Sequence, residues 1–171
     1  MKWRSILSLS AIAALGAVLL PGGAAAQQKS LKDQLVGTWT VVSWVQTNKD
    51  GVKFERFSAN PKGFNVFDAN GRFYVMYARP DLPKIASNNP STPTPEEAKA
   101  LAGGAIAYFG TYTIDEAAKT VSFRVEASSF PNQIGINQAR LITALTADEL
   151  RYTNKNALTG GPIDIAFRRA K

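Results

Sequence analysis

The chain has no cysteine and no histidine among its 171 residues. Without cysteine it forms no disulfide and cannot carry the lipid-modified cysteine of a bacterial lipoprotein. Without histidine and cysteine it cannot build a Ser-His-Asp triad, a cysteine nucleophile or the usual zinc and copper sites. We therefore expect no metal and no cofactor, and any catalysis would depend on Asp, Glu, Tyr, Lys or Arg.

Only one long apolar run is present, at residues 6–20, and it follows the basic residues Lys2 and Arg4. It ends in a Pro-Gly-Gly-Ala-Ala-Ala segment, a pattern typical of a secretory signal peptide cleaved before Gln27. A retained membrane anchor is the alternative, but the run is shorter than the ~20 residues that span a bilayer. We therefore predict that residues 1–26 are a signal peptide and that the protein is periplasmic or extracellular.

Residues 27–171 are long enough for one domain with a single core. Loss of Lys2 and Arg4 takes the formal net charge from +7 to +5, and the remaining basic residues are mostly scattered. This distribution favours a solvated surface over an anionic partner. Without a basic stripe we do not expect a nucleic-acid partner, and without a second long apolar run we do not expect stable membrane insertion.

Alternation of apolar and polar side chains dominates this domain and predicts about nine short strands with mostly short connections. In the first strand, Trp39 and Val41 share one face, while Trp44 and Gln46 share the other. Consecutive hairpins leave exposed edges unless the sheet closes, so we predict an all-β fold with one antiparallel up-and-down barrel. A two-sheet sandwich is the alternative. The predicted strands are residues 39–46, 52–57, 63–68, 72–79, 111–114, 120–127, 138–146, 149–153 and 163–169.

One short α-helix interrupts the predicted strands. Residues 80–95 are rich in proline and predict an irregular loop, either a lid over an open barrel end or a plain surface excursion. Thr94 and Glu97 form a capping-box pattern that starts a helix over about 95–107. The small apolar residues of this helix predict close packing against the sheet. Upstream, Leu31 and Leu35 are spaced for a single helical turn.

The order of several motifs resembles the bacterial lipocalin-like domain family of the calycin superfamily. That resemblance implies a closed antiparallel barrel and an apolar ligand. Family members often carry histidines where Phe123 and Arg124 stand here, so no acid-base role of such histidines carries over. The motifs are Leu35-Val36-Gly37-Thr38-Trp39, Pro61-Lys62-Gly63, Asn70-Gly71-Arg72, Arg79-Pro80-Asp81, Thr94-Pro95-Glu96-Glu97, Tyr108-Phe109-Gly110-Thr111-Tyr112-Thr113, Val125-Glu126 and Phe130-Pro131-Asn132.

The resemblance also implies a structural contact at the start of the first strand. In lipocalins an arginine from the last strand typically lies across the tryptophan of a Gly-x-Trp motif, here Gly37 and Trp39. Arg169 is the candidate because it shares the period-two face of Phe167, whereas Arg168 lies on the other face. The alternative is that Arg169 is a frayed terminal residue.

Two groups of side chains are candidates for a ligand pocket. Arg79, Glu126 and Arg140 could form a charged cluster at the barrel mouth that orients a ligand carboxylate or hydroxyl. The alternative for Glu126 is simple exposure on the polar face of its strand.

The middle strands are rich in aromatic residues, and tyrosines can supply both an apolar wall and a hydroxyl group. Of the tyrosines there, we predict Tyr74, Tyr77 and Tyr112 as pocket residues, although a single bulge would invert the faces.

From these features we predict an exported protein that binds a small apolar or amphipathic ligand. One alternative is an isomerase or cyclase that uses Glu126 or a tyrosine as acid or base. A second alternative is a protein-interaction module, for which the sign would be an apolar patch on a solid barrel.

Overall fold

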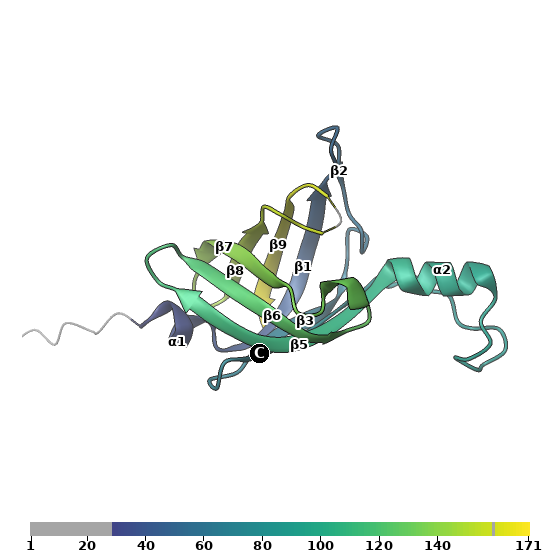
Figure 1. Cartoon of the computed structure of the whole chain (residues 1–171), viewed down its shortest axis with the longest axis horizontal. Helices are drawn as coiled ribbons and strands as arrows, with labels where there is room; N and C mark the ends of the chain where they lie inside the picture. Colours follow the sequence, from purple (N-terminus) through teal and green to yellow (C-terminus); the bar gives the residue numbers. More distant parts are fainter. Residues whose placement is uncertain (1–28, 159) are drawn as a thin grey trace, which may run out of the picture.

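The strands close into an antiparallel barrel of eight strands with one extra strand beside it (Figure 1). The computed structural model describes residues 29–158 and 160–171, so the predicted signal peptide lies outside the described residues. The strands are β1 (Gly37–Thr47), β2 (Lys53–Phe54), β3 (Lys62–Phe67), β4 (Arg72–Ala78), β5 (Ala105–Asp115), β6 (Thr120–Ser128), β7 (Asn137–Leu145), β8 (Glu149–Asn154) and β9 (Ile163–Arg169). Among the described residues, two α-helices and one 3-10 helix accompany the strands: α1 (Leu31–Leu35), α2 (Pro95–Gly104) and η1 (Pro131–Gln133).

Each strand from β3 to β9 pairs with its neighbour in the sequence, and β1 pairs with both β3 and β9. The β1–β9 ladder runs from the Trp39–Arg169 pair to the Gln46–Ile163 pair and closes the ring. This topology confirms the predicted up-and-down barrel and excludes the sandwich. The second predicted strand, 52–57, is wrong in length, because only Lys53–Phe54 pairs, with the end of β1.

Side chains on the inner face form one core, in which the strands alternate as predicted. On β6, Val121, Phe123 and Val125 are buried and the intervening side chains point outward. Aromatic rings fill the half of the barrel nearest α1. There, Phe73 lies 4.6 Å from Phe123 between ring centroids, and Phe67 lies 5.1 Å from Tyr112. This end is therefore solid.

The first strand departs from its predicted faces at a β-bulge. Val41 pairs with Phe167 but Ser43 pairs with Ala166, so one extra residue, Val42, shifts the register of β1. A bulge of this kind moves all following side chains to the other face of the sheet. Trp39 and Val41 are therefore buried before the bulge, while Trp44 and Gln46 are buried after it.

Helix α1 covers one end of the barrel, where Leu35 is fully buried. Helix α2 starts at the predicted capping box, with the Thr94 Oγ1 and Glu97 side chains both engaged. Its predicted extent, 95–107, is wrong, because β5 starts at Ala105. None of the described helices is long and apolar enough to cross a membrane.

The predicted packing of α2 against the sheet is also wrong. Figure 1 shows α2 projecting away from the barrel, and its residues Ala98 and Ala102 are exposed. Loop 80–95 follows the helix outward and is held to it by a hydrogen bond from Ala86 N to Glu97 Oε1 (2.9 Å). A weakly amphipathic helix of small residues buries too little apolar surface to be held on the barrel.

Candidate functional site

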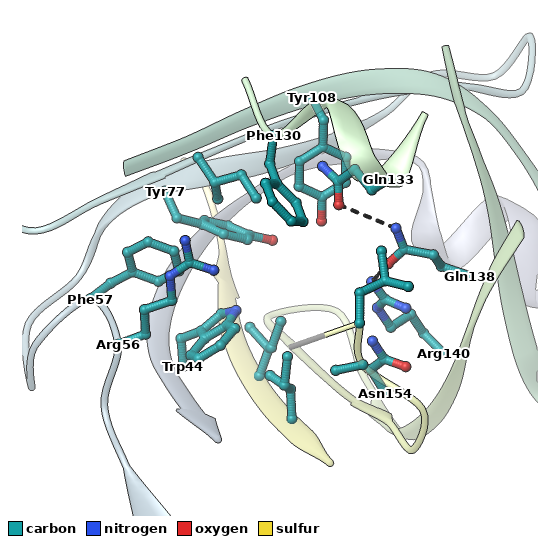
Figure 2. A pocket seen from close by; sticks show the side chains of 15 residues that line it. Trp44, Arg56, Phe57, Tyr77, Tyr108, Phe130, Gln133, Gln138, Arg140 and Asn154 are labelled. Carbon is teal, nitrogen blue, oxygen red and sulfur yellow. Dashed lines mark hydrogen bonds between the residues drawn. The ribbon is translucent and has the colours of Figure 1, made fainter. Parts of the chain in front are cut away.

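A narrow cavity opens at the end of the barrel opposite α1 (Figure 2). It holds about 540 Å3 of space free of atoms, including the part open to solvent, of which about 50 Å3 admits the centre of a water molecule. The cavity therefore suits a slender or flat molecule rather than a bulky one. Its lining residues are Trp44, Arg56, Phe57, Tyr77, Ile106, Tyr108, Phe130, Gln133, Gln138, Arg140, Asn154, Ala157, Leu158, Ile163 and Ile165.

One wall of the cavity is apolar, and Phe57 is at its centre. Strand β3 pairs with β1 only along Gly37–Thr40, so the two strands separate toward the mouth. Phe57 comes from the segment between β2 and β3 and is fully buried beside this separation. Its ring packs against Trp44 in a T-shaped arrangement, with 5.1 Å between centroids, and its centroid lies 5.9 Å from that of Tyr77. At the rim, Arg56 lies over Phe57 at 5.1 Å and donates from Nε to Gly103 O.

The facing wall is polar and forms a chain of hydrogen bonds. Gln133 of η1 donates from Nε2 to Ser128 Oγ (2.6 Å). It accepts from Gln138 Nε2 (3.2 Å), as Figure 2 shows. Gln138 in turn accepts from Arg140 Nη2 at 2.6 Å. The chain joins the end of β6 to β7 where their ladder has stopped, because β6 pairs with β7 only as far as Arg124.

Arg140 is 5 % exposed and is the only fully charged side chain among the buried residues of the described structure. Its guanidinium carbon lies 5.4 Å from the centroid of the Phe123 ring, and Nη1 donates to Ala139 O at 3.3 Å. The ion pairs among the described residues are Arg72–Glu126, Arg79–Asp81 and Arg151–Glu149. No residue of the described structure therefore supplies a carboxylate to Arg140.

Neutral phenols lie deep in the barrel below the mouth. Tyr152 accepts a hydrogen bond from Asn65 Nδ2 (3.1 Å), and its hydroxyl lies 3.4 Å from that of Tyr77. Burial raises the pKa of the Tyr77, Tyr108 and Tyr152 hydroxyls, and for Tyr108 the nearby Arg140 works against that increase. All three phenols are therefore protonated near neutral pH and cannot balance the charge of Arg140.

The predicted cluster of Arg79, Glu126 and Arg140 is wrong, because its members lie apart. Glu126 is exposed on the outer face of β6 and forms a bidentate pair with Arg72, at 2.8 and 2.9 Å. Arg79 pairs with Asp81 beside the start of loop 80–95. The even-numbered residues of β6 point outward, so Glu126 cannot reach the cavity, and only Arg140 of the three lines it.

The three predicted tyrosines also lie apart. Tyr77 lines the cavity, whereas Tyr112 lies near the α1 end and donates from its hydroxyl to Asp68 O at 2.7 Å. Tyr74 is 43 % exposed on the outside of β4, stacked 6.4 Å from Phe109. Tyr77 shares the inner face of β4 with Phe73 and Val75, and Tyr74 has the opposite parity.

Several cavity residues were not among the predicted candidates. Trp44 was assigned to the wrong face of β1 because the bulge at Val42 has no clear sequence signal. Gln133 and Phe130 come from η1 and the residue before it, whose turn follows no simple period. Asn154 does follow the parity of Tyr152 on β8, so that signal was available. Within the described structure, loop 80–95 contributes no lining residue, so it is not a lid over this cavity.

At the opposite end, Arg169 makes the predicted contact with Trp39. Its guanidinium carbon lies 4.0 Å from the centroid of the Trp39 ring, and Nη1 and Nη2 donate to Val36 O (2.9 Å) and Gln34 O (2.6 Å). Trp39 Nε1 donates to Leu35 O at 2.7 Å. Gly37 has φ +130°, and a Cβ there would lie 2.7 Å from Arg169 Nη1. This contact ties α1 to β1 and β9.

The described residues contain no group of three or more Asp or Glu side chains placed to hold a metal ion.

Comparison with known proteins agrees with the barrel architecture. The sequence model of a family described as a lipocalin-like domain matches residues 36–163. No curated protein matches the sequence.

Three solved structures are similar in fold. A lipocalin-like protein from Bacteroides uniformis shares 16% identity, with a TM-score of 0.46 over 80% of this chain and 99% of that one. A redesigned β-barrel shares 15% identity (TM-score 0.44, 84% of this chain and 100% of that one). A de novo fluorescence-activating β-barrel shares 12% identity (TM-score 0.44, 83% and 99%).

Proposed function

Because the chain belongs to the lipocalin-like domain family, we propose that it binds a small, largely apolar molecule in the cavity at the open end of its barrel. The observation that carries this proposal is the contrast between the two ends. Aromatic rings fill the end near α1, while Trp44, Phe57 and Tyr77 surround free space at the other end. Ligand sites are typically concave, mostly apolar and equipped with a few polar groups, as this one is.

The two alternatives have less support. Glu126, the acid-base candidate of an isomerase or cyclase, lies outside the barrel in an ion pair with Arg72. The tyrosines in or beside the cavity have raised pKa values, which makes them poor bases near neutral pH. A protein-interaction module would be expected to combine an exposed apolar patch with a solid barrel. Phe64, Tyr74, Met76 and Phe109 are exposed together on the outer face, but the barrel has a cavity.

Tryptophan fluorescence and native mass spectrometry test the proposal together. We expect 1-decanol to change the emission of Trp44 and to give a one-to-one complex. Affinity should weaken from decanol to octanol to hexanol, by up to about 0.8 kcal/mol for each CH2 lost from an apolar cavity.

The matched control is Trp44→Phe, which should keep the complex but lose most of the fluorescence change. Binding of no alcohol in the series would contradict the proposal. So would an affinity that does not depend on chain length.

We also propose that the protein acts outside the cytoplasm, because residues 1–26 have the pattern of a cleaved signal peptide. Expression in a Gram-negative host should place a protein that begins at Gln27 in the periplasm. An intact N-terminus in the cytoplasmic fraction would contradict export without affecting the proposed binding.

A further inference from the structure

We infer that the ligand carries a carboxylate, and that Arg140 binds it inside the cavity. This inference rests on the proposed function, because it specifies the polar end of the molecule that the cavity holds.

Arg140 carries a buried positive charge. An arginine remains charged at all physiological pH values, and a buried charge is costly unless it is paired and hydrogen-bonded. Arg140 is 5 % exposed, yet the described ion pairs leave it without a carboxylate. Its partners are the side chain of Gln138, the Ala139 carbonyl, the Tyr108 hydroxyl and the Phe123 ring, all of them neutral.

The donors of Arg140 are only partly used by these neighbours. A guanidinium has five N–H groups in a planar fork, and one bond from Nη1 and one from Nη2 are made to Ala139 O and Gln138 Oε1. Gln138 itself is fixed by Gln133, so Arg140 is oriented by neighbouring side chains. A planar carboxylate matches the remaining donors, since paired N–H···O bonds form readily between these two groups.

The cavity has the polarity that an amphipathic acid requires. In Figure 2, Arg140, Gln138 and Asn154 lie on one side, and Trp44 and Phe57 lie on the other. A carboxylate at Arg140 would leave the rest of a slender molecule against the apolar wall. The phenol of Tyr108, which interacts with Arg140, stays protonated and can donate to the same carboxylate.

Arg140 is more deeply buried than Arg56 and Arg151. Arg56 is half-buried at the rim of the cavity and donates to Gly103 O. Arg151 lies on the outer face of β8 and pairs with Glu149. Arg151 therefore provides the matched control for the loss of one positive charge outside the cavity.

The test compares decanoate with 1-decanol by isothermal titration calorimetry at neutral pH. The two molecules share a chain length and differ in the charged group. We expect the unmodified protein to bind decanoate at least about ten-fold more tightly, because a charge-assisted bond is stronger than a neutral one. Arg140→Gln should abolish this preference while the affinity for 1-decanol stays within about three-fold. Arg151→Gln, outside the cavity, should keep it.

Arg140→Lys covers the case in which Arg140→Gln does not fold, as judged by circular dichroism. Lysine keeps the charge but loses the planar fork, so decanoate should bind at least about three-fold more weakly than to the unmodified protein. Unchanged decanoate affinity in Arg140→Lys would overturn the inference.

The remaining outcomes separate the two proposals. Equal binding of decanoate and 1-decanol, or a preference that survives in Arg140→Gln, would overturn the carboxylate inference and leave the proposed function standing. Binding of neither molecule would overturn both.

Discussion

Arg169 shows how one side chain can hold the closed end of a barrel. Its guanidinium covers the Trp39 ring and donates to two carbonyls of the α1 region, Gln34 O and Val36 O. These carbonyls lie at and just beyond the end of a five-residue helix, which is too short to be stable alone. Arg169 therefore links a weak local element to the first and last strands at once.

Replacement of Arg169 by alanine should destabilise the whole domain. The variant loses a cation-π contact and charged hydrogen bonds, which together are worth about 2–4 kcal/mol. We expect a decrease in melting temperature of roughly 5–15 °C in a domain of this size. Arg168→Ala, on the exposed face of β9, should change the free energy of unfolding by about 0.5 kcal/mol or less. Equal melting temperatures for the two variants would contradict the role of Arg169.

The choice of Arg169 over Arg168 was predictable from sequence because β9 is regular. Its buried residues Ile163, Ile165 and Phe167 alternate without interruption up to Arg169. The same reasoning could have separated Tyr77 from Tyr74, because Phe73, Val75 and Tyr77 share the buried face of β4. It could also have placed Glu126 outside, because Val121, Phe123 and Val125 identify the inner face of β6.

At the scale of whole elements, the sequence predicted the order and number of strands but not the irregularities that shape the cavity. Alternation along a strand predicts the face of each side chain only as far as the next bulge. In β1 the extra residue at Val42 turns Trp44 inward. The end of β6 has a similar shift opposite Phe109 and Gly110. A bulge depends on how two strands fit each other, so a single strand does not reveal it. The cavity walls were therefore less predictable than the core.

The sequence predicted where helix α2 begins, but it did not predict that the helix projects from the barrel. The Thr94–Glu97 capping box is a local pattern and is present. Whether the helix packs on the sheet depends on the direction in which the chain leaves the barrel between β4 and β5. In this protein that direction is outward, as Figure 1 shows. Its stability must then come mainly from local interactions.

The pH dependence of α2 follows from Glu97. Hydrogen bonds from the amides of Ala86 and Thr94 lower the pKa of the Glu97 carboxyl below its usual value. The stabilisation is therefore complete above the pKa of an unfolded glutamate, about 4.3, and is lost as the pH falls through the lower folded-state value.

Amide hydrogen exchange across this pH range measures the effect. Protection of Ala86 and Thr94, relative to the intrinsic exchange rates, should fall below about pH 4.3 while the strands of the barrel stay protected. Glu97→Ala should show low protection of these two amides at every pH, whereas Glu96→Gln should behave as the unmodified protein does. The same pH profile in Glu97→Ala would show that another group controls the helix.

For the molecule as a whole, the β1–β9 ladder closes the barrel into a continuous ring of paired strands. The two ends of this barrel differ in the side chains that they contain. The α1 end contains packed aromatic rings and the Arg169 contact. The open end has strands that separate at β1–β3 and β6–β7, and the added segments around Phe57 and Gln133 line the space between them. The cavity therefore forms where β1 and β3, and β6 and β7, are paired over only part of their length, while the remaining pairs keep the barrel closed.

A ligand in this cavity should stabilise the ring and leave the projecting α2 region unchanged. The lining side chains belong to β1, β4, β5, β7, β8 and β9 and to the segments that follow β2, β6 and β8, so one ligand contacts most of the barrel. A ligand at a hundred times its dissociation constant adds about 2.7 kcal/mol to the free energy of unfolding. With 1-decanol at that concentration we expect the melting temperature to rise by roughly 5–10 °C.

Hydrogen exchange of the same samples shows where the stabilisation acts. Amides near the mouth, such as those of Trp44 and Tyr77, should exchange more slowly with 1-decanol, and the amides of residues 84–100 should exchange at unchanged rates. The Trp44→Ala variant, with a larger and less complementary cavity, should show a smaller increase in melting temperature. Slower exchange across residues 84–100 would instead mean that the loop closes over the bound molecule, because a segment that makes no contact with the ligand gains no protection from it.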